Sequence, residues 1–438
     1  MKKTYAIINY GCQMNESDSE HYAGQLLDLG YEASADYEHA DVVVINTCCV
    51  RENAEKKILG KIGEMKRLKR ENPDMVLCVA GCMAQEWGKD LQKKYPQVDL
   101  VLGTAHVNNF SSILQNHLAG HGRAESVYDD LTIMPQEFEG SFVRKSSFAA
   151  WVPIMYGCNN FCTYCIVPYV RGRERSRSAE AICHEIEKAV ALGYKEFTLL
   201  GQNVNSYRTG DVDFPALLKS VAEISPLLRV RFATSHPKDM SDRLIETMAS
   251  MPNICRAIHL PAQSGSTAVL ERMNRKYTRE WYLGRVDAIR CLMPDCAITT
   301  DLIAGFCGET EEDHRATLSL MEQVGYDFAY MFKYSERPGT YAQRHLKDDV
   351  PDEVKTARLT EIINLQNELS ERSNRRDVGK EFEILVEGVS KRSDDQLFGR
   401  TSQNKVVVFD RGNHAAGDYV RVRITGCSSA TLYGEEIF

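Results

Sequence analysis

The sequence contains no apolar run long enough to cross a membrane. A membrane-spanning helix needs about 20 consecutive apolar residues, and no stretch of the 438 residues approaches that length. The basic start, residues 1–3, precedes only the short apolar stretch 5–9, which polar groups interrupt and which does not suit a secretory signal. We therefore expect a first β-strand at residues 5–9, a cytoplasmic protein and no membrane partner.

An excess of positive charge is also missing. The chain has 53 Lys and Arg against 61 Asp and Glu, a formal net charge of -8. The protein as a whole therefore does not attract nucleic acid, so any RNA contact must come from local basic patches. A hydrophobic content of 43% with 26% charged residues is typical of globular proteins. The length predicts two or three domains.

Cysteine, in contrast, is abundant, with 14 residues. Structural disulfides are rare in a reducing compartment, so clustered cysteines there are better explained as metal ligands or catalytic thiols. The positions of the cysteines along the predicted elements are therefore the main guide to function.

The first hundred residues alternate short apolar runs with amphipathic stretches, which predicts a β-α-β-α-β series. A parallel sheet with helices on its faces follows from that order. Asn15 and Ser17 are suitable N-caps for the first helix, and Gly30 is suitable to end it. The expected strands are 5–9, 41–46 and 75–80, and the expected helices are 17–29 and 52–70.

Residues 115–147 lack this alternation of apolar and amphipathic stretches, which predicts a connecting segment. Beyond them, six predicted strands separated by helical patterns fit an α/β barrel, complete or partial, with its chemistry at the carboxyl ends of the strands. The last 60 residues contain runs rich in β-branched side chains that are separated by glycines, which predicts a small all-β barrel. The expected strands are 150–155, 196–200, 229–234, 256–260, 297–303 and 326–334 in the first barrel, and 381–386, 405–409 and 418–424 in the second.

The predicted fold class is therefore α/β with three parts. We expect an N-terminal open parallel sheet domain at residues 1–118, a linker at 119–145, a partial (β/α)6 barrel at 146–374 and a small all-β barrel at 375–438.

Cys158, Cys162 and Cys165 form a C-x3-C-x2-C run directly after the first predicted barrel strand. Three thiolates can hold three irons of a 4Fe-4S cube and leave the fourth iron open for chemistry. No fourth cysteine follows within a few residues, which does not suit a four-cysteine zinc or electron-transfer site. Chance clustering, or zinc with a distant partner, is the plainer alternative.

This run resembles the signature of the radical-SAM superfamily, C-x3-C-x-aromatic-C after the first barrel strand, with Tyr164 at the aromatic position. The resemblance implies that S-adenosylmethionine (SAM) binds the open iron and that an electron from the cluster cleaves it to a 5′-deoxyadenosyl radical. It also implies that Tyr164 lies against the adenine; ordinary packing is the alternative role.

Three further cysteines follow strands of the N-terminal domain: Cys12, Cys48 and Cys82. If these strands are parallel, the three thiols emerge at one sheet edge, where open α/β folds place their ligands. A second three-thiolate cluster is the simplest interpretation, and unrelated buried thiols are the alternative. Cys49 and Cys78 are not predicted ligands, because one lies a residue past the matching position and the other lies inside a strand.

With two such clusters, the whole chain resembles the methylthiotransferases, a radical-SAM family with an N-terminal cluster domain and a C-terminal TRAM barrel that binds RNA. Several motifs resemble the MiaB branch of that family. They are Gly11-Cys12-Gln13-Met14-Asn15, Asn46-Thr47-Cys48, Arg51-Glu52-Asn53-Ala54, Gly81-Cys82-Met83-Ala84-Gln85, the run 171–177, and 385–390 with 399–401.

That branch converts N6-isopentenyladenosine at position 37 of tRNA to its 2-methylthio derivative. The resemblance implies two 4Fe-4S clusters and two SAM molecules: one methylates a sulfur held on the second cluster, and the other yields the radical that activates carbon 2 of the adenine. It further implies a tRNA substrate. We also expect a low-potential electron donor of the flavodoxin or ferredoxin type, and a monomer.

The loops after the later barrel strands supply candidate SAM contacts, because the superfamily binds SAM at these strand ends. Each such residue is a weak indication alone, since glycine and serine also serve plain turns. His236 invites a general-base role, but a structural role is equally consistent with radical chemistry. Cys307 stands where the family has proline and is not a predicted ligand. The candidates are Gln202, Asn203, Ser235, Gln263, Ser264, Ile303 and Gly305.

Arginines just beyond the cysteine run could pair with RNA phosphates. They are Arg171, Arg173, Arg175 and Arg177, and Arg400 joins them with other basic residues near the start of the TRAM barrel. A solvated charged face or internal ion pairs are the alternatives.

Two other functions remain open on the sequence. A sibling methylthiotransferase would share the cysteines and act on threonylcarbamoyl-adenosine in tRNA or on an aspartate of a ribosomal protein. A non-catalytic iron-sulfur RNA-binding or electron-transfer protein is the rival from another class, although three-cysteine sites count against it.

Overall fold

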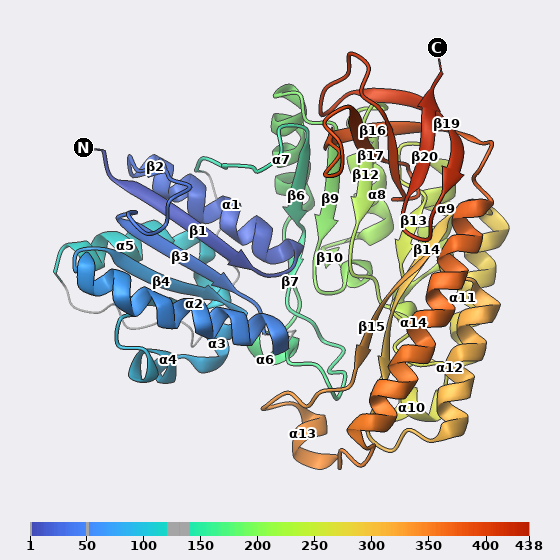
Figure 1. The fold of residues 1–438 in the computed structure, drawn as a ribbon, viewed down its shortest axis with the longest axis horizontal. Helices are drawn as coiled ribbons and strands as arrows, with labels where there is room; N and C mark the ends of the chain where they lie inside the picture. Colours follow the sequence, from blue (N-terminus) through green and yellow to red (C-terminus); the bar gives the residue numbers. More distant parts are fainter. Residues whose placement is uncertain (1, 50–51, 121–130, 132–139, 438) are drawn as a thin grey trace. The chain divides into compact units, whose positions relative to one another are not determined.

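The computed structural model describes residues 2–49, 52–120, 131 and 140–437, and the chain folds into two compact units (Figure 1). The first comprises Met1–Ser146, Met155–Asn159 and Cys165–Arg175, and the second comprises Ser147–Ile154, Asn160–Tyr164 and Ser176–Phe438. The segment 155–175 is thus shared between the units. Within the described residues, no helix combines the length and apolar character needed to cross a bilayer.

A five-stranded parallel sheet with strand order β2-β1-β3-β4-β5 forms the centre of the first unit. The register pairs Tyr10 with Thr47 and Thr47 with Gly81, so β1, β3 and β4 end at one edge. The three predicted strands are confirmed to within one residue at each end. The strands are β1 (Thr4–Tyr10), β2 (Glu32–Ala33), β3 (Val42–Thr47), β4 (Val76–Gly81) and β5 (Leu100–Leu102).

Helices cover both faces of this sheet, as the order of elements predicts. Alternate residues of β3 separate the two cores: Val43 and Ile45 join one cluster, while Val42 and Val44 join the other. The helices are α1 (Gln13–Asp28), α2 (Glu52–Glu71), α3 (Cys82–Trp87), α4 (Lys89–Lys94), η1 (Thr104–Asn109) and α5 (Phe110–Leu118), with α6 (Val167–Val170) and the short strand β7 (Met155–Tyr156) from the shared segment.

The start of α1 differs from the prediction. Asn15 and Ser17 are expected N-caps, but the helix begins at Gln13, with Cys12 at its N-cap position. The Asn15 side-chain oxygen accepts hydrogen bonds from the Cys12 N–H and S–H groups, both at 3.3 Å. The chain therefore turns into the helix directly at the end of β1. Gly30, with φ of +85°, follows the C-cap as expected.

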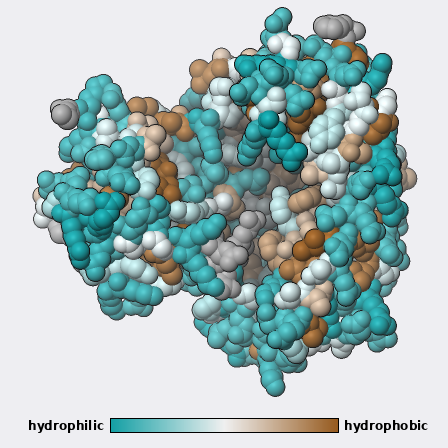
Figure 2. Space-filling view, in the orientation of Figure 1, coloured by the Kyte–Doolittle hydropathy of each residue, from teal (hydrophilic) through white to brown (hydrophobic). Residues whose placement is uncertain are grey.

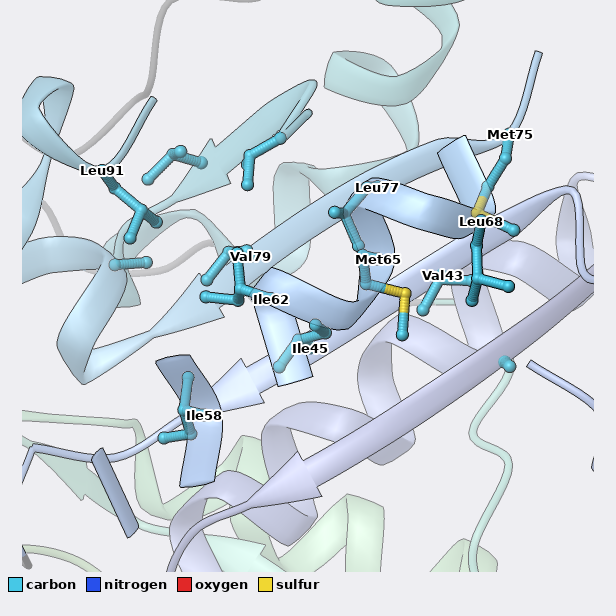
Figure 3. Close-up of a cluster of buried hydrophobic side chains, with 14 of the residues drawn as sticks. Val43, Ile45, Ile58, Ile62, Met65, Leu68, Met75, Leu77, Val79 and Leu91 are labelled. Carbon is cyan, nitrogen blue, oxygen red and sulfur yellow. The ribbon is translucent and has the colours of Figure 1, made fainter. Parts of the chain in front are cut away.

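Side chains of β3, α2 and β4 point toward one another in the larger core of this unit (Figure 3). Ile45 is fully buried among them. We predict that Ile45→Ala lowers the free energy of unfolding by about 3 kcal/mol, because it removes buried methyl groups and leaves a cavity. Ile45→Val, the matched control, should cost about 1 kcal/mol. Urea unfolding measures both, and equal losses would contradict the packing described.

Six parallel strands form the centre of the second unit. Pairing gives β6-β9-β12 and β13-β14-β15, and a parallel bridge between Val230 and Ile254 connects the two groups. This is the predicted partial barrel, with all six strands at the predicted places. They are β6 (Ala149–Pro153), β9 (Glu196–Leu200), β12 (Arg229–Phe232), β13 (Ala257–His259), β14 (Ala297–Ala304) and β15 (Phe328–Lys333).

Helices follow these strands and pack on the outside of the partial barrel (Figure 1). Most begin with a side-chain cap, such as Ser178 for α7 and Thr278 for α11. The helices are α7 (Ala179–Ala191), α8 (Phe214–Glu223), α9 (Asp242–Ser250), α10 (Thr267–Arg272), α11 (Arg279–Leu292), α12 (Glu311–Val324), α13 (Tyr341–His345) and α14 (Asp352–Arg375). Short elements are β8 (Arg175–Ser176), η2 (Val204–Ser206), β10 (Arg208–Thr209), β11 (Val212–Asp213) and η3 (Pro237–Asp239).

The C-terminal residues form a closed five-stranded barrel with strand order β16-β17-β18-β20-β19. Three of its strands are predicted, and two are not. The missed strands contain Gly399 and Gly434, which weaken the strand pattern. The strands are β16 (Glu381–Val389), β17 (Gln396–Arg400), β18 (Val406–Asp410), β19 (Tyr419–Cys427) and β20 (Leu432–Glu436).

This closed barrel is joined to the partial barrel at the amino ends of the strands of the partial barrel. Arg229, the first residue of β12, donates to the main-chain oxygens of Arg400 and Glu383, both at 2.6 Å. Arg231 donates to the main-chain oxygens of Thr401 and Ser402 at 2.8 and 3.1 Å. The joint therefore lies at the opposite end of the strands from the carboxyl ends, where the predicted SAM contacts lie.

Candidate metal centres

Three thiols emerge at the carboxyl edge of the N-terminal sheet. Cys12 follows β1, Cys48 follows β3, and Cys82 opens α3 directly after β4. Cys48 and Cys82 are buried, and Cys12 is exposed. The parallel register, which aligns the ends of the three strands, brings the thiols to one place although they lie up to 70 residues apart in the chain.

The motif residues around these cysteines hold the strand ends together. Asn15 donates to the Asn46 side-chain oxygen at 3.1 Å and to the Thr47 main-chain oxygen at 3.0 Å. Asn46 donates back to the main-chain oxygen of Asn15 at 2.8 Å. Gly81 has a φ of +94°, and a Cβ there would lie 2.4 Å from the Thr47 oxygen. A side chain at Gly81 would therefore push apart the ends of β3 and β4.

The three predicted ligands and the neighbouring Cys49 form two hydrogen-bonded pairs, Cys12 with Cys48 and Cys82 with Cys49. This pairing shifts the pKa values of the thiols. A bond from Cys48 lowers the pKa of Cys12 to about 6, with the positive charge of Arg171 assisting. A bond from Cys49, again with Arg171 assisting, lowers the pKa of Cys82. The bond to Cys82 and burial raise the pKa of Cys49. Thiolate character is thus favoured at two of the three predicted ligands.

Cys49 is excluded as a ligand by the sequence pattern, but it is a fourth thiol of this group, buried beside Cys82. Cys78 is buried inside β4, as expected. In the described part of the chain, no three Cys, His, Asp or Glu side chains already surround one point as metal ligands. A cluster at Cys12, Cys48 and Cys82 therefore requires these thiols to turn from their pairwise bonds toward a common metal.

Arg171 lies against this group of thiols. Its guanidinium donates to the Cys82 sulfur at 3.3 Å and to the Asp18 carboxylate at 3.0 Å, and the residue is 4% exposed. The sequence interpretation assigns Arg171 to RNA phosphates, but its donors face the interior of the first unit. Three thiols, two of them with a lowered pKa, lie beside a buried cation and form a donor set that fits an anionic iron-sulfur cluster.

The cysteine run after β6 is divided between the units: Cys158 and Cys165 belong to the first and Cys162 to the second. The Cys158 N–H donates to the Gly172 oxygen at 3.1 Å. Gly157, with φ of +78°, has no room for a Cβ, which would lie 2.1 Å from the oxygen of Arg173.

Within the second unit, Cys162 has a buried arginine as its neighbour. Arg275 donates to the Cys162 sulfur at 3.4 Å and to the Pro261 oxygen at 2.8 Å. Asn274 holds the loop from the same side, donating to the Phe161 oxygen at 2.9 Å. The sequence interpretation names neither residue, because their partners lie more than 100 positions away.

The predicted SAM contacts lie at the carboxyl ends of the barrel strands, and several present buried polar atoms. Asn203 donates to Asp239 at 2.8 Å. Its side-chain oxygen, the Ser235 hydroxyl and the His236 Nε2 are buried and have no hydrogen-bond partner among the described residues. Buried polar atoms usually have partners, so these three fit contacts to a polar ligand.

His236 has a structural bond as well. Its Nδ1 accepts a hydrogen bond from the Lys238 N–H at 3.3 Å, and burial lowers its pKa well below the usual range. The ring is therefore neutral and lies edge-on to Tyr277. This geometry favours a structural role over that of a general base.

The remaining candidates line the same ends. The rings of Tyr164 and Phe306 meet edge-to-face, with 6.3 Å between their centroids. Both belong to a cluster that includes Ile303. Gln263 has φ of +68° although it is not glycine, a conformation that costs energy and is concentrated at functional sites. Ser264 is buried against Thr317, and Gln202 is half-buried.

Position 305 requires glycine because of close packing and because of its φ of +73°. A Cβ at this position would lie 2.3 Å from Cγ of Lys355. Its N–H donates to the Glu309 carboxylate at 2.9 Å. The nearby Cys307 is buried with Phe306 and Val269, which is consistent with a packing role rather than ligation.

The other arginines predicted to contact RNA differ in their surroundings. Arg173 is exposed, and Arg175 donates to the Arg171 oxygen at 2.9 Å. Arg177 pairs with Glu185 at 2.9 Å, and Arg400 pairs with Glu387 at 2.9 Å. Internal ion pairs, the alternative to phosphate binding, are therefore present at Arg177 and Arg400.

Two further surfaces lie on the second unit: an apolar one that the sequence did not predict, and a basic one whose Arg372 and Arg376 are among the basic residues expected near the start of the TRAM barrel. Apolar side chains gather over β15 and α14 on an otherwise largely hydrophilic face (Figure 2), and Phe328 and Tyr330 are each 47% exposed. A cavity of about 260 Å³ beside α14 is lined by Arg290, Arg372 and Arg376. Exposed aromatic rings and clustered arginines suit nucleic acid.

Comparisons with known proteins agree with this architecture. Residues 4–103 match the Uncharacterized protein family UPF0004, residues 152–321 the Radical SAM superfamily and residues 375–437 the TRAM domain. The tRNA-2-methylthio-N(6)-dimethylallyladenosine synthase of Bacteroides fragilis is 55% identical over 441 residues, covering 100% of this chain and 96% of its own. The enzyme of that name from Porphyromonas gingivalis is 50% identical, covering 100% and 95%.

Solved structures share the fold at low sequence identity. The radical SAM methyltransferase TsrM from Kitasatospora setae, with tryptophan and a SAM analogue bound, has a TM-score of 0.56 and 14% identity, covering 78% of this chain and 75% of its own. The cobalamin-dependent radical enzyme OxsB has a TM-score of 0.52 and 12% identity, covering 84% and 62%.

Proposed function

Because this chain belongs to the radical-SAM methylthiotransferase family of tRNA-2-methylthio-N(6)-dimethylallyladenosine synthases, we propose that it inserts a methylthio group at carbon 2 of N6-isopentenyladenosine at position 37 of tRNA. The reaction uses two SAM molecules for each product. The convergence of Cys12, Cys48 and Cys82 at one sheet edge, beside Arg171, supports the second cluster. The full-length likeness to the synthases is the observation that carries the choice of substrate.

Two sets of cysteines would hold the clusters: Cys158, Cys162 and Cys165, and Cys12, Cys48 and Cys82. When bound, the first cluster supplies the electron that cleaves SAM, and the second supplies the metal site for the transferred sulfur. In each set three thiolates would hold three irons and leave one iron for a ligand that the protein does not provide.

The residues at the barrel strand ends bind and orient SAM in this proposal. The Asn203 oxygen, the Ser235 hydroxyl and the neutral His236 ring offer buried polar atoms to its amino acid and ribose groups. Tyr164, packed on Phe306, offers an aromatic face to the adenine. Gln202, Gln263, Ser264, Ile303 and Gly305 complete the predicted set. Asn203, Ser235, His236, Gln263 and Ser264 are buried, and their burial helps to exclude water from the reacting atoms.

The RNA contacts combine aromatic and basic groups of the second unit. Phe328 and Tyr330 on β15 can stack on bases, and the cavity lined by Arg372 and Arg376 can accept a phosphate. The exposed Arg173 is the member of the predicted arginine set with the most accessible side chain. The C-terminal TRAM barrel, a fold type used for oligonucleotides, adds Arg400.

The remaining parts of the proposal concern the setting of the reaction. We assign residues 1–118 to the second-cluster domain, 119–145 to a linker, 146–374 to the radical-SAM domain and 375–438 to the TRAM barrel. Cleavage of SAM requires a low-potential electron donor, for which flavodoxin- or ferredoxin-like proteins are suitable. The protein acts as a monomer in the cytoplasm.

Mass analysis of tRNA nucleosides tests this function. The chain is expressed in a bacterial strain that lacks its own tRNA methylthiolation. We expect 2-methylthio-N6-isopentenyladenosine to appear and N6-isopentenyladenosine to decrease, and the Cys162→Ala variant, as the control, to leave both unchanged. A methylthio product on threonylcarbamoyl-adenosine or on ribosomal aspartate would replace the substrate assignment. Absence of 5′-deoxyadenosine from the reduced protein with SAM would favour the non-catalytic alternative.

A further inference from the structure

Each predicted cluster site contains one buried arginine that donates a hydrogen bond to a cysteine sulfur. In the first unit Arg171 donates to Cys82 at 3.3 Å, and in the second unit Arg275 donates to Cys162 at 3.4 Å. Both arginines are at most 5% exposed. Two separate folds thus place a guanidinium against one ligand of a three-cysteine set.

The two arginines differ in how their charge is neutralised. Arg171 forms a buried ion pair with Asp18 at 3.0 Å, so the pair adds a dipole rather than a full charge beside the thiols. Arg275 donates to the Tyr277 hydroxyl at 3.1 Å and to the Pro261 oxygen. In the part of the chain that the structure describes, no carboxylate bonds to Arg275.

A buried guanidinium without a carboxylate is costly unless another anion compensates its charge. The Arg275 guanidinium bonds instead to the Tyr277 hydroxyl, the Pro261 oxygen and the Cys162 sulfur. A cluster ligated by three thiolates carries negative charge and would supply the missing compensation. The position of Arg275 is therefore explained by an anionic group held at Cys162.

Hydrogen bonds to cysteine sulfur also change the properties of a cluster. They delocalise negative charge from the sulfur, and they therefore stabilise the reduced form, which carries one more electron, relative to the oxidised form. A positive charge nearby acts in the same direction. Loss of either effect makes the reduction potential of the cluster more negative.

We propose that Arg171 and Arg275 are positioning residues, each of which sets the reduction potential of one cluster: Arg171 for the cluster at Cys12, Cys48 and Cys82, and Arg275 for the cluster at Cys158, Cys162 and Cys165. This inference rests on the proposed function for the presence of both clusters. It adds that the two potentials are controlled separately, by residues outside the ligand sets.

Redox titration followed by electron paramagnetic resonance tests the assignment on anaerobically reconstituted protein. The two clusters are observed one at a time, in full-length backgrounds that carry Ala at one set of three cysteines. We expect Arg171→Gln to make only the Cys12-set potential more negative, and Arg275→Gln to do so only for the Cys158-set potential. Arg171→Lys, which keeps the charge but loses the planar fork, should give a smaller shift.

Asp18→Asn should shift the reduction potential of the Cys12-set cluster in the opposite direction from Arg171→Gln. It removes the carboxylate and leaves the positive charge of Arg171 uncompensated, so the potential should become less negative. The double variant Asp18→Asn, Arg171→Gln replaces the ion pair by neutral groups of similar size, which avoids an unpaired buried charge. It should give a negative shift smaller than that of Arg171→Gln, together with wild-type iron content.

Arg229→Gln is the matched control, because this arginine is also buried but bonds to the C-terminal barrel at the amino ends of the strands. It should move neither potential. The inference would be overturned if one variant shifted the reduction potentials of both clusters, or if Arg171→Gln and Asp18→Asn shifted neither potential. Either result would leave the presence of the clusters unchallenged. A wild-type protein without iron would overturn the proposed function, and this inference with it.

Discussion

Replacing Cys12, Cys48 and Cys82 together by alanine is expected to abolish methylthio product while the protein still cleaves SAM reductively. The three thiols lie at the edge of the N-terminal sheet, and the predicted SAM contacts lie in the second unit. The variant therefore removes the site of the transferred sulfur and none of the groups that bind SAM. Iron should fall from about eight to about four per chain, because one of two cubes is lost.

The fold should survive this change. Alanine fills most of the space of a cysteine, and Arg171 keeps its ion pair with Asp18 after the Cys82 sulfur is gone. The measurements are 5′-deoxyadenosine and modified nucleoside from the same anaerobic reaction, with iron content. Cys78→Ala is the matched control: this thiol is buried inside β4, so product formation should persist. Normal methylthio product from the triple variant would refute the separate roles of the two sets.

Replacing Cys158, Cys162 and Cys165 by alanine should have a more complete effect. Both 5′-deoxyadenosine and methylthio product are expected to fall below detection, because no thiolates remain to hold the iron that binds SAM. About four irons per chain should remain, now on the other set. Arg275 keeps its bonds to Tyr277 and Pro261, which should hold its side chain in place in the variant although the anionic group at Cys162 is lost.

The comparison of the two triple variants is more informative than either alone. Both lose the modified nucleoside, but only the second loses SAM cleavage. Cys307→Ala, a buried cysteine outside both sets, controls for general sensitivity to cysteine loss. If the second variant still formed 5′-deoxyadenosine, the assignment of SAM cleavage to these cysteines would be wrong.

Cys49→Ala separates a ligand from a neighbouring thiol. Cys49 lies beside Cys82 and is hydrogen-bonded to it, although the sequence pattern excludes it from the ligand set. With Cys12, Cys48 and Cys82 as ligands, Cys49→Ala should keep about eight irons per chain. Loss of about half the iron would instead place Cys49 in the set.

The convergence of the N-terminal thiols could be predicted because it follows from local rules. Apolar periodicity locates β1, β3 and β4, and parallel order places their ends at one edge. The positions of Cys12, Cys48 and Cys82 after these strands then determine their proximity. The same reasoning locates all six strands of the partial barrel, and with them the loops that contain Asn203 and Ser235.

The roles of Arg171 and Arg275 could not be predicted in this way. Arg171 lies 153 positions from Asp18, and Arg275 lies 113 positions from Cys162, so no local pattern connects the partners. An arginine in a basic run is more often solvated, which favoured the interpretation of Arg171 as a phosphate ligand. Burial, which the sequence does not reveal residue by residue, is what changes that interpretation.

The missed strands β17 and β20 have a similar explanation. Gly399 interrupts the pattern of β17, yet a Cβ there would lie 2.2 Å from the Leu385 oxygen, so the glycine serves the close approach of two strands. Barrel closure stabilises such short segments through pairing on both edges, and that pairing is a property of the complete module.

At the joint between the two barrels of the second unit, four hydrogen bonds from two arginines have main-chain oxygens as acceptors. Arg229 and Arg231 bond to the backbone of Glu383, Arg400, Thr401 and Ser402, and those four bonds do not depend on the side chains at the same positions. Substitutions at positions 383 and 400–402 can therefore change the surface of the barrel while these four bonds to the partial barrel are retained.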